Sequence, residues 1–144
     1  MKKLLLLFNI ITLIGILSSC NSKNLGDNIY LLDGDRKEDR IIVECTGKSF
    51  RDCIGGTYLI PRSYEEHFSN GYYSEFVDNA KANEDYIIAS TVSVNNGIKR
   101  YWIIDKKKKK LDKTMDNDSS FILGPLDFNS FLEERKKSNI RLNF

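Results

Sequence analysis

The strongest constraint on the fold is a pair of apolar runs separated by a short polar turn. The runs are Tyr86–Val94 and Ile98–Asp105, and Asn95-Asn96-Gly97 lies between them. β-Branched and aromatic residues dominate both runs, and Asn-Gly suits the positive φ angles of a type I′ turn. We therefore predict an antiparallel hairpin that is closed by a two-residue turn at Asn96-Gly97.

That turn would also set the pairing of the two strands. It places apolar side chains on both faces of the hairpin, whereas a strand with one solvated face alternates between apolar and polar residues. We therefore expect the hairpin to be central in its sheet and covered on both sides, by a second sheet or by a helix. The expected cross-strand pairs are Val92 with Tyr101, Thr91 with Trp102, Ser90 with Ile103 and Ala89 with Ile104.

Three shorter runs also have the composition of strands: residues 28–32, 40–45 and 57–60. Residues 62–82 contain several aromatic residues at roughly helical spacing, but Gly71 and its polar neighbours interrupt the pattern. We predict that this middle segment is a loop with one or two short turns.

A helix is predicted near the C-terminus, over residues 127–137. Its apolar residues follow an i, i+3, i+4 pattern at 128, 131 and 132, Asp127 suits the capping position, and Pro125 precedes it. Together these elements predict a mainly β fold of the α+β class, a small antiparallel sheet or sandwich with a C-terminal helix.

Two of the three cysteines, Cys45 and Cys53, flank a polar, glycine-containing segment that can turn. In an oxidising compartment such an even pair favours a disulfide. A metal or redox pair is disfavoured because there is no CxxC motif and because the only histidine, His67, has no ligand partners at metal-site spacing. We expect a structural disulfide, and neither a metal nor another cofactor.

The N-terminal segment has the three parts of a secretory signal: Lys2 and Lys3, an apolar run, and then small residues. The apolar run has 14 residues, from Leu4 to Leu17, fewer than the roughly 20 that a membrane-spanning helix needs. The residues Leu17-Ser18-Ser19-Cys20 resemble the lipobox of bacterial lipoproteins. That resemblance implies cleavage after residue 19 and acylation of the Cys20 thiol.

The resemblance also implies a location and a domain division. Asn21, rather than the Asp that retains some bacterial lipoproteins at the inner membrane, follows Cys20, and no acidic residue precedes Asp27. We therefore expect a periplasm-facing lipoprotein of the outer membrane. The expected division is a signal peptide over 1–19, a lipidated flexible tether over 20–27 and a single β-rich domain over 28–144.

Cleavage would change the charge balance, because the signal contains Lys2 and Lys3 and no acids. The 22 basic residues fall to 20, against 20 acidic ones, so that the net charge falls from +2 to zero. A neutral chain gives no electrostatic case for nucleic acid as a partner. The 125 remaining residues suffice for one domain with a modest core.

Three short motifs of the remaining chain resemble a family of small, uncharacterised bacterial lipoproteins. They are Tyr86-Ile-Ile-Ala, Tyr101-Trp-Ile-Ile-Asp-Lys and Gly124-Pro-Leu126, the last before a C-terminal helix. The resemblance implies a shared fold. It brings no functional residues, because that family has no established activity.

Several polar clusters have two interpretations each. Asp33, Asp35 and Asp39, and likewise Asp116 and Asp118, offer oxygen ligands, but neither group completes an EF-hand loop, so we interpret them as acidic turns. The run 106–110 consists of five lysines and could contact anionic lipid or an acidic partner, yet such runs are usually solvated loops. His67 beside Glu65 and Glu66 lacks the context of a nucleophile, which disfavours an enzyme.

An aromatic set remains, in the polar-flanked segment from 64 to 76. Aromatic residues there suit a protein-binding surface or a core equally well. We expect Phe76 and Val77 to be buried. The residues offered as a partner-binding surface are Tyr64, Phe68, Tyr72 and Tyr73.

Three classes of function fit this sequence. The first is a membrane-anchored, non-catalytic protein-binding module, for example an immunity protein that blocks a secreted toxin. The second is a structural or assembly lipoprotein of the cell envelope, and the third is an enzyme with an unrecognised site. The expected partners are the membrane, through the N-terminal lipid, and another protein.

Overall fold

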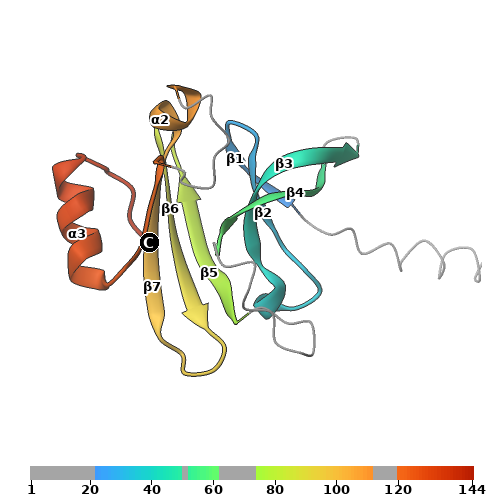
Figure 1. Cartoon of the computed structure of the whole chain (residues 1–144), viewed down its shortest axis with the longest axis horizontal. Coiled ribbons are helices and arrows are strands. Elements are labelled where there is room, and N and C mark those ends of the chain that lie inside the picture. The colour runs from blue at the N-terminus through green and yellow to red at the C-terminus, as the bar shows by residue number, and fades with distance from the viewer. Residues whose placement is uncertain (1–21, 50–51, 62–73, 112–119) are drawn as a thin grey trace, which may run out of the picture.

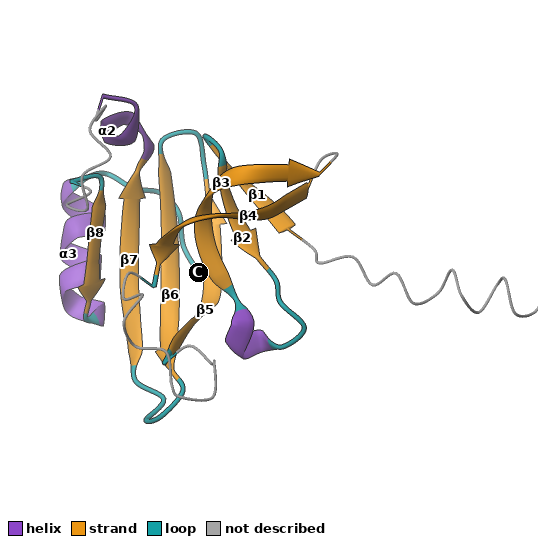
Figure 2. Cartoon of the chain, turned by 45° about the vertical axis from the view of Figure 1, so that its right-hand side comes forward, coloured by secondary structure: helices purple, strands orange, loops and turns teal. Residues whose placement is uncertain are grey.

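In the computed structural model, two four-stranded antiparallel sheets pack face to face, as Figures 1 and 2 show. The structure describes residues 22–49, 52–61, 74–111 and 120–144. The first sheet has the order β1-β2-β3-β4 and the second the order β5-β6-β7-β8. The strands are β1 (Ser22–Gly26), β2 (Ile29–Leu32), β3 (Ile41–Ser49), β4 (Asp52–Ile60), β5 (Glu75–Ala82), β6 (Tyr86–Ser93), β7 (Lys99–Asp105) and β8 (Ile122–Leu126).

Three helical elements accompany the sheets. They are the 3-10 turn η1 (Lys37–Asp39) and the helices α2 (Lys106–Leu111) and α3 (Phe128–Lys137). The sheet-and-helix architecture confirms the predicted mainly β fold with a C-terminal helix. Neither α2 nor α3, the α-helices in the described residues, combines the length and the apolar run that crossing a membrane requires.

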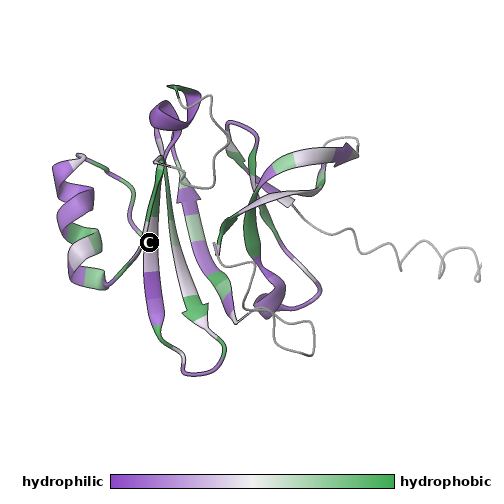
Figure 3. Ribbon diagram, in the orientation of Figure 1, coloured by the Kyte–Doolittle hydropathy of each residue, from purple (hydrophilic) through white to green (hydrophobic). Residues whose placement is uncertain are grey.

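The main core lies between the two sheets and draws residues from all eight strands. Its fully buried members include Ile29 and Ile42 from the first sheet and Val77, Ile87 and Ile104 from the second. Figure 3 shows the apolar residues as green bands along the strands. Burying large aliphatic side chains of this kind contributes about 1.5 to 3 kcal/mol each, so this interface holds the sandwich together.

The predicted hairpin exists as β6 and β7, the two central strands of the second sheet. Its inner face packs on the first sheet through Ala89 and Trp102, and its outer face packs under α3 through Ile88 and Ile103. The expectation that both faces are covered is therefore confirmed, by a sheet on one side and a helix on the other.

The predicted register of this hairpin is wrong by two residues. Thr91 pairs with Arg100 rather than Trp102, and Ser90 pairs with Tyr101 rather than Ile103. The cause is a four-residue loop over 94–97, closed by a hydrogen bond from the Ser93 amide to the Ile98 carbonyl oxygen (3.0 Å). Because side chains alternate with period two, a shift of two residues leaves every side chain on its predicted face.

A two-residue turn of the type predicted for Asn96-Gly97 is found instead between β1 and β2. Asp27 and Asn28 have φ angles of 51° and 64°, as a type I′ turn requires, and Gly26 pairs with Ile29 across it. Residues 22–26 therefore form a paired strand, with Leu25 only 3% exposed. The prediction of a flexible tether over this stretch is wrong.

A second correction concerns the middle segment. Its last eight residues are not a loop but β5, which pairs with β6 through a bulge between Val77 and Asn79. Phe76 (7% exposed) and Val77 (0%) are buried, as expected. The remainder of that segment, residues 62–73, lies outside the described residues.

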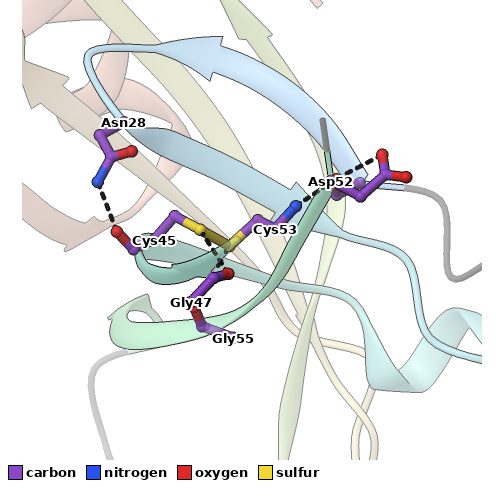
Figure 4. Close-up of a disulfide and its surroundings, with 7 residues drawn as sticks. Asn28, Cys45, Gly47, Asp52, Cys53 and Gly55 are labelled. Carbon is purple, nitrogen blue, oxygen red and sulfur yellow. Dashed lines mark hydrogen bonds between the residues drawn. A yellow bond between two sulfur atoms is a disulfide. The ribbon is translucent and has the colours of Figure 1, made fainter. Parts of the chain in front are cut away.

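Cys45 and Cys53 form the predicted disulfide, with their Cα atoms 5.8 Å apart (Figure 4). The pairing of β3 and β4 shifts register on both sides of Gly47, and both sulfurs are buried in a cluster with Tyr30 and Val43 on the outer face of the first sheet. The disulfide thus links β3 to β4 near the turn that connects them, on the outer face of the first sheet.

Candidate functional site

Four aromatic rings gather on the outer side of the second sheet, where β7, the start of α3 and the C-terminal segment meet. We call Tyr101, Phe128, Phe131 and Phe144 the aromatic cluster. The Tyr101 ring centroid lies 5.3 Å from that of Phe128, 5.0 Å from Phe131 and 5.9 Å from Phe144. Phe131 is 1% exposed, whereas Phe128 and Phe144 are 53% and 41% exposed. The cluster therefore has one buried ring beneath an exposed apolar surface.

The first turn of α3 fixes the position of Phe128. The carboxylate of Asp127 accepts hydrogen bonds from the amides of Asn129 (2.9 Å) and Ser130 (3.1 Å) and from the Ser130 hydroxyl (2.7 Å). These bonds, led by the one from the Ser130 side chain, lower the pKa of Asp127. A capped helix start holds Phe128 at the first helical position, beside Tyr101.

The end of α3 returns the chain to the same place. Asn139 has a φ of 51°, and the amides of Asn139 and Ile140 donate to the carbonyl oxygens of Lys136 (3.1 Å) and Arg135 (2.9 Å), the bond pattern of a Schellman motif. Ile140 is buried under the helix. The last residues therefore run back along the sheet.

Arg135 then holds the C-terminal segment against the helix. Its guanidinium donates to the carbonyl oxygen of Leu142 (3.4 Å) and to the side-chain oxygen of Asn143 (2.7 Å). Phe144 follows directly and contacts both Tyr101 and Phe131. Polar bonds at both ends of α3 thus arrange the cluster, so that its exposed rings are preorganised.

The lysine run at 106–110 is not the solvated loop that its sequence predicts. It forms α2 at one end of the sandwich, drawn in purple in Figure 3. Its first residue, Lys106, is 3% exposed, and its ammonium donates to the carbonyl oxygens of Leu25 (2.5 Å) and Asn83 (2.6 Å). The expectation of a solvated loop is therefore wrong for this residue, whose amine joins the two sheets.

Three further lysines of the run form ion pairs with acids of β3 and of the turns after β1 and β5. Their partners are Asp85 for Lys107 (3.0 Å), Glu44 for Lys109 (2.7 Å) and Asp27 for Lys110 (3.0 Å). These pairs neutralise much of the positive charge of α2, because each lysine has an acidic partner within the same domain. The run therefore makes a poor site for anionic lipid.

An open depression lies between α2 and the turns of both sheets, lined by residues that include Asn24, Asp27, Asn83 and Lys106. Desolvation lowers the pKa of Lys106, and the nearby carboxylate of Asp27 acts in the opposite direction. The Lys106 ammonium already donates hydrogen bonds to two carbonyl oxygens. This arrangement gives the amine a structural role rather than that of a nucleophile.

The acidic turn at 33–39 is held by arginines. Arg40 bonds to Asp33 (2.5 Å), and Arg36 bonds to Asp39 (2.8 Å). Within the described ranges there is no group of three or more His, Cys, Asp or Glu side chains that could hold a metal ion.

Other residues singled out by sequence lie outside the described residues: Cys20, Tyr64, Glu65, Glu66, His67, Phe68, Tyr72, Tyr73, Asp116 and Asp118. The aromatic cluster, by contrast, was not predicted as a site. The sequence predicts Phe128 and Phe131 on one face of a helix and Tyr101 in a strand. Only the folded structure shows that these three rings lie close to Phe144. The one sequence feature that could have indicated this site is an aromatic residue, Phe128, at the first position of a capped helix.

Comparison with protein-family models, with curated proteins and with solved structures finds no match to this chain. The function of the chain is therefore inferred from its own residues.

Proposed function

We propose that the protein is a lipid-anchored protein of the bacterial cell envelope that binds another protein without catalysing a reaction. The observation that carries the proposal is the aromatic cluster, with two large rings about half exposed on a rigid support. Aromatic residues are enriched at the centres of protein interfaces, where they bury much area at little conformational cost. An immunity protein that blocks a secreted toxin is one module of this kind.

The anchor is proposed from the lipobox-like Leu17-Ser18-Ser19-Cys20. Several acyl chains, at about 0.8 kcal/mol per buried CH₂, would hold the domain stably at a periplasm-facing outer-membrane surface. Replacing Cys20 with Ala should release the protein from washed membranes into the soluble fraction. Retention of the Cys20→Ala protein after a high-salt wash would contradict the anchor.

The binding surface is tested with the full-length tagged protein, purified from envelopes in mild detergent with the proteins bound to it. Phe128→Ala and Phe144→Ala should each weaken binding of a co-purifying partner by about 2 kcal/mol, roughly thirtyfold, because each removes an exposed ring from the interface. Ile98→Ala is the matched control, since Ile98 is similarly exposed (52%) but lies at the β6–β7 loop. A partner that binds all three variants equally tightly does not use the aromatic cluster.

A further inference from the structure

Very few residues separate the proposed lipid attachment from the folded domain. β1 begins at Ser22, two residues after Cys20 in the sequence. Two residues of extended chain span about 7 Å at most. If Cys20 carries the lipid, as the proposed function holds, Ser22 must therefore lie close to the headgroups of the bilayer.

Ser22 is itself fixed to the β3–β4 hairpin. Its hydroxyl accepts a hydrogen bond from the Cys53 amide (3.1 Å) and lies 3.4 Å from a carboxylate oxygen of Asp52. The disulfide holds Cys53 in place within the folded sheet. The described residue nearest the lipid is therefore attached to a stapled hairpin, and only Asn21 lies between it and Cys20 in the sequence.

The same hairpin carries a highly exposed apolar side chain. Ile54 follows Cys53, is 71% exposed and lies over Gly47. The charges around it are mixed, with Lys48 and Asp52 on the same hairpin. An exposed isoleucine beside an acyl anchor suits the apolar boundary of a bilayer better than open solvent.

The aromatic cluster lies on the other side of the molecule. In Figures 1 and 2 the second sheet separates α3 from the first sheet, which carries β1 and the β3–β4 hairpin. We infer that the end of the sandwich formed by Ser22, Cys53 and Ile54 rests on the bilayer that holds the lipid of Cys20, so that α3 and the aromatic cluster point away from the membrane. A partner would then approach from the aqueous side.

The test places one reporter on each side of the molecule. Ile54→Trp and Phe128→Trp are made in the lipidated full-length protein, which is reconstituted into phosphatidylcholine vesicles with acyl-chain-brominated lipid. Bromine quenches indole fluorescence only at near contact, and the native Trp102 is 2% exposed in the core and provides a common background. The indole of Ile54→Trp should be quenched at least about twofold more strongly than that of Phe128→Trp, because at most about 7 Å of chain can separate Cys20 from Ser22.

Flotation of the same samples separates the two proposals. Vesicle-bound protein with equal quenching in both variants, or stronger quenching for Phe128→Trp, overturns the orientation while keeping the anchor. Protein that does not float with vesicles overturns the anchor and the orientation together. A matched control inserts about ten Gly and Ser residues after Asn21, which should abolish the difference in quenching because a flexible linker of that length lets the domain rotate.

Discussion

The lysine run of α2 and the aromatic cluster beside α3 differ in where their side chains go. In α2 the ammonium of Lys106 is buried between two carbonyl oxygens, and its neighbours Lys107 and Lys110 pair with acids in turns of both sheets. In the cluster, Phe128 and Phe144 leave about half of their surface exposed. Residue type would predict the reverse, with charge outside and rings inside. The difference indicates that the charges of α2 serve the fold, whereas the exposed rings are the surface through which we propose that a partner binds.

The largest expected effect distinguishes the buried ring of the cluster from an exposed one. Phe131→Ala should lower the free energy of unfolding by about 3 to 5 kcal/mol, because it leaves a cavity between the sheet and α3. Phe128→Ala should cost less than about 1 kcal/mol, since water already reaches that ring. Urea denaturation of both variants measures the difference. Similar losses would mean that the cluster is core throughout.

An intermediate effect is expected for the half-buried ion pair of α2. In a double-mutant cycle with Lys109→Met and Glu44→Gln, we expect a coupling energy of about 1 kcal/mol, because the lysine side chain is only 14% exposed. The matched control is the pair of Lys107 with Asp85, which is largely exposed and should show no measurable coupling. Equal coupling in the two pairs would show that the burial of the Lys109 side chain does not strengthen its ion pair.

The smallest expected effect concerns charges away from α2. Asp78 bonds to Lys37 and Lys99, and these bonds lower its pKa below the ordinary value. A carboxylate with a lowered folded-state pKa stabilises the protein above its unfolded pKa, and this contribution disappears as the pH falls through the folded pKa.

Acidification from about pH 5 to about pH 2 should therefore destabilise the wild type slightly more than Asp78→Asn, as measured by the melting temperature at each pH. Parallel losses in the two proteins would show that these bonds add nothing to stability.

Sequence predicted those elements whose signals are local. The β6–β7 hairpin, the capped helix after Asp127 and the pair of Cys45 with Cys53 each depend on residues close together in the chain. β5 was missed because its bulge at Val77 and Asn79 breaks the strand alternation. β1 was missed because only one of its five residues, Leu25, is buried. The strand is recognised only from its pairing with β2.

The candidate site was harder to predict because its contacts are long-range. Lys106 bonds to Leu25, 81 residues earlier in the chain. The rings of Tyr101 and Phe144 meet only after α3 has reversed the chain. Composition identified the lysine run and the aromatic residues but could not tell which of them the fold would bury, since burial depends on partners from distant segments.

The most direct test of this division of roles is a side-by-side thermal unfolding measurement, by circular dichroism, of two variants. Lys106→Met removes the donor from the buried carbonyl oxygen of Leu25 and from the part-buried carbonyl oxygen of Asn83, which should cost about 1 to 3 kcal/mol and lower the melting temperature by several degrees. The double variant Phe128→Ala, Phe144→Ala should melt closer to the wild type, since both rings are already exposed to water. A double variant that melts below Lys106→Met would contradict the account.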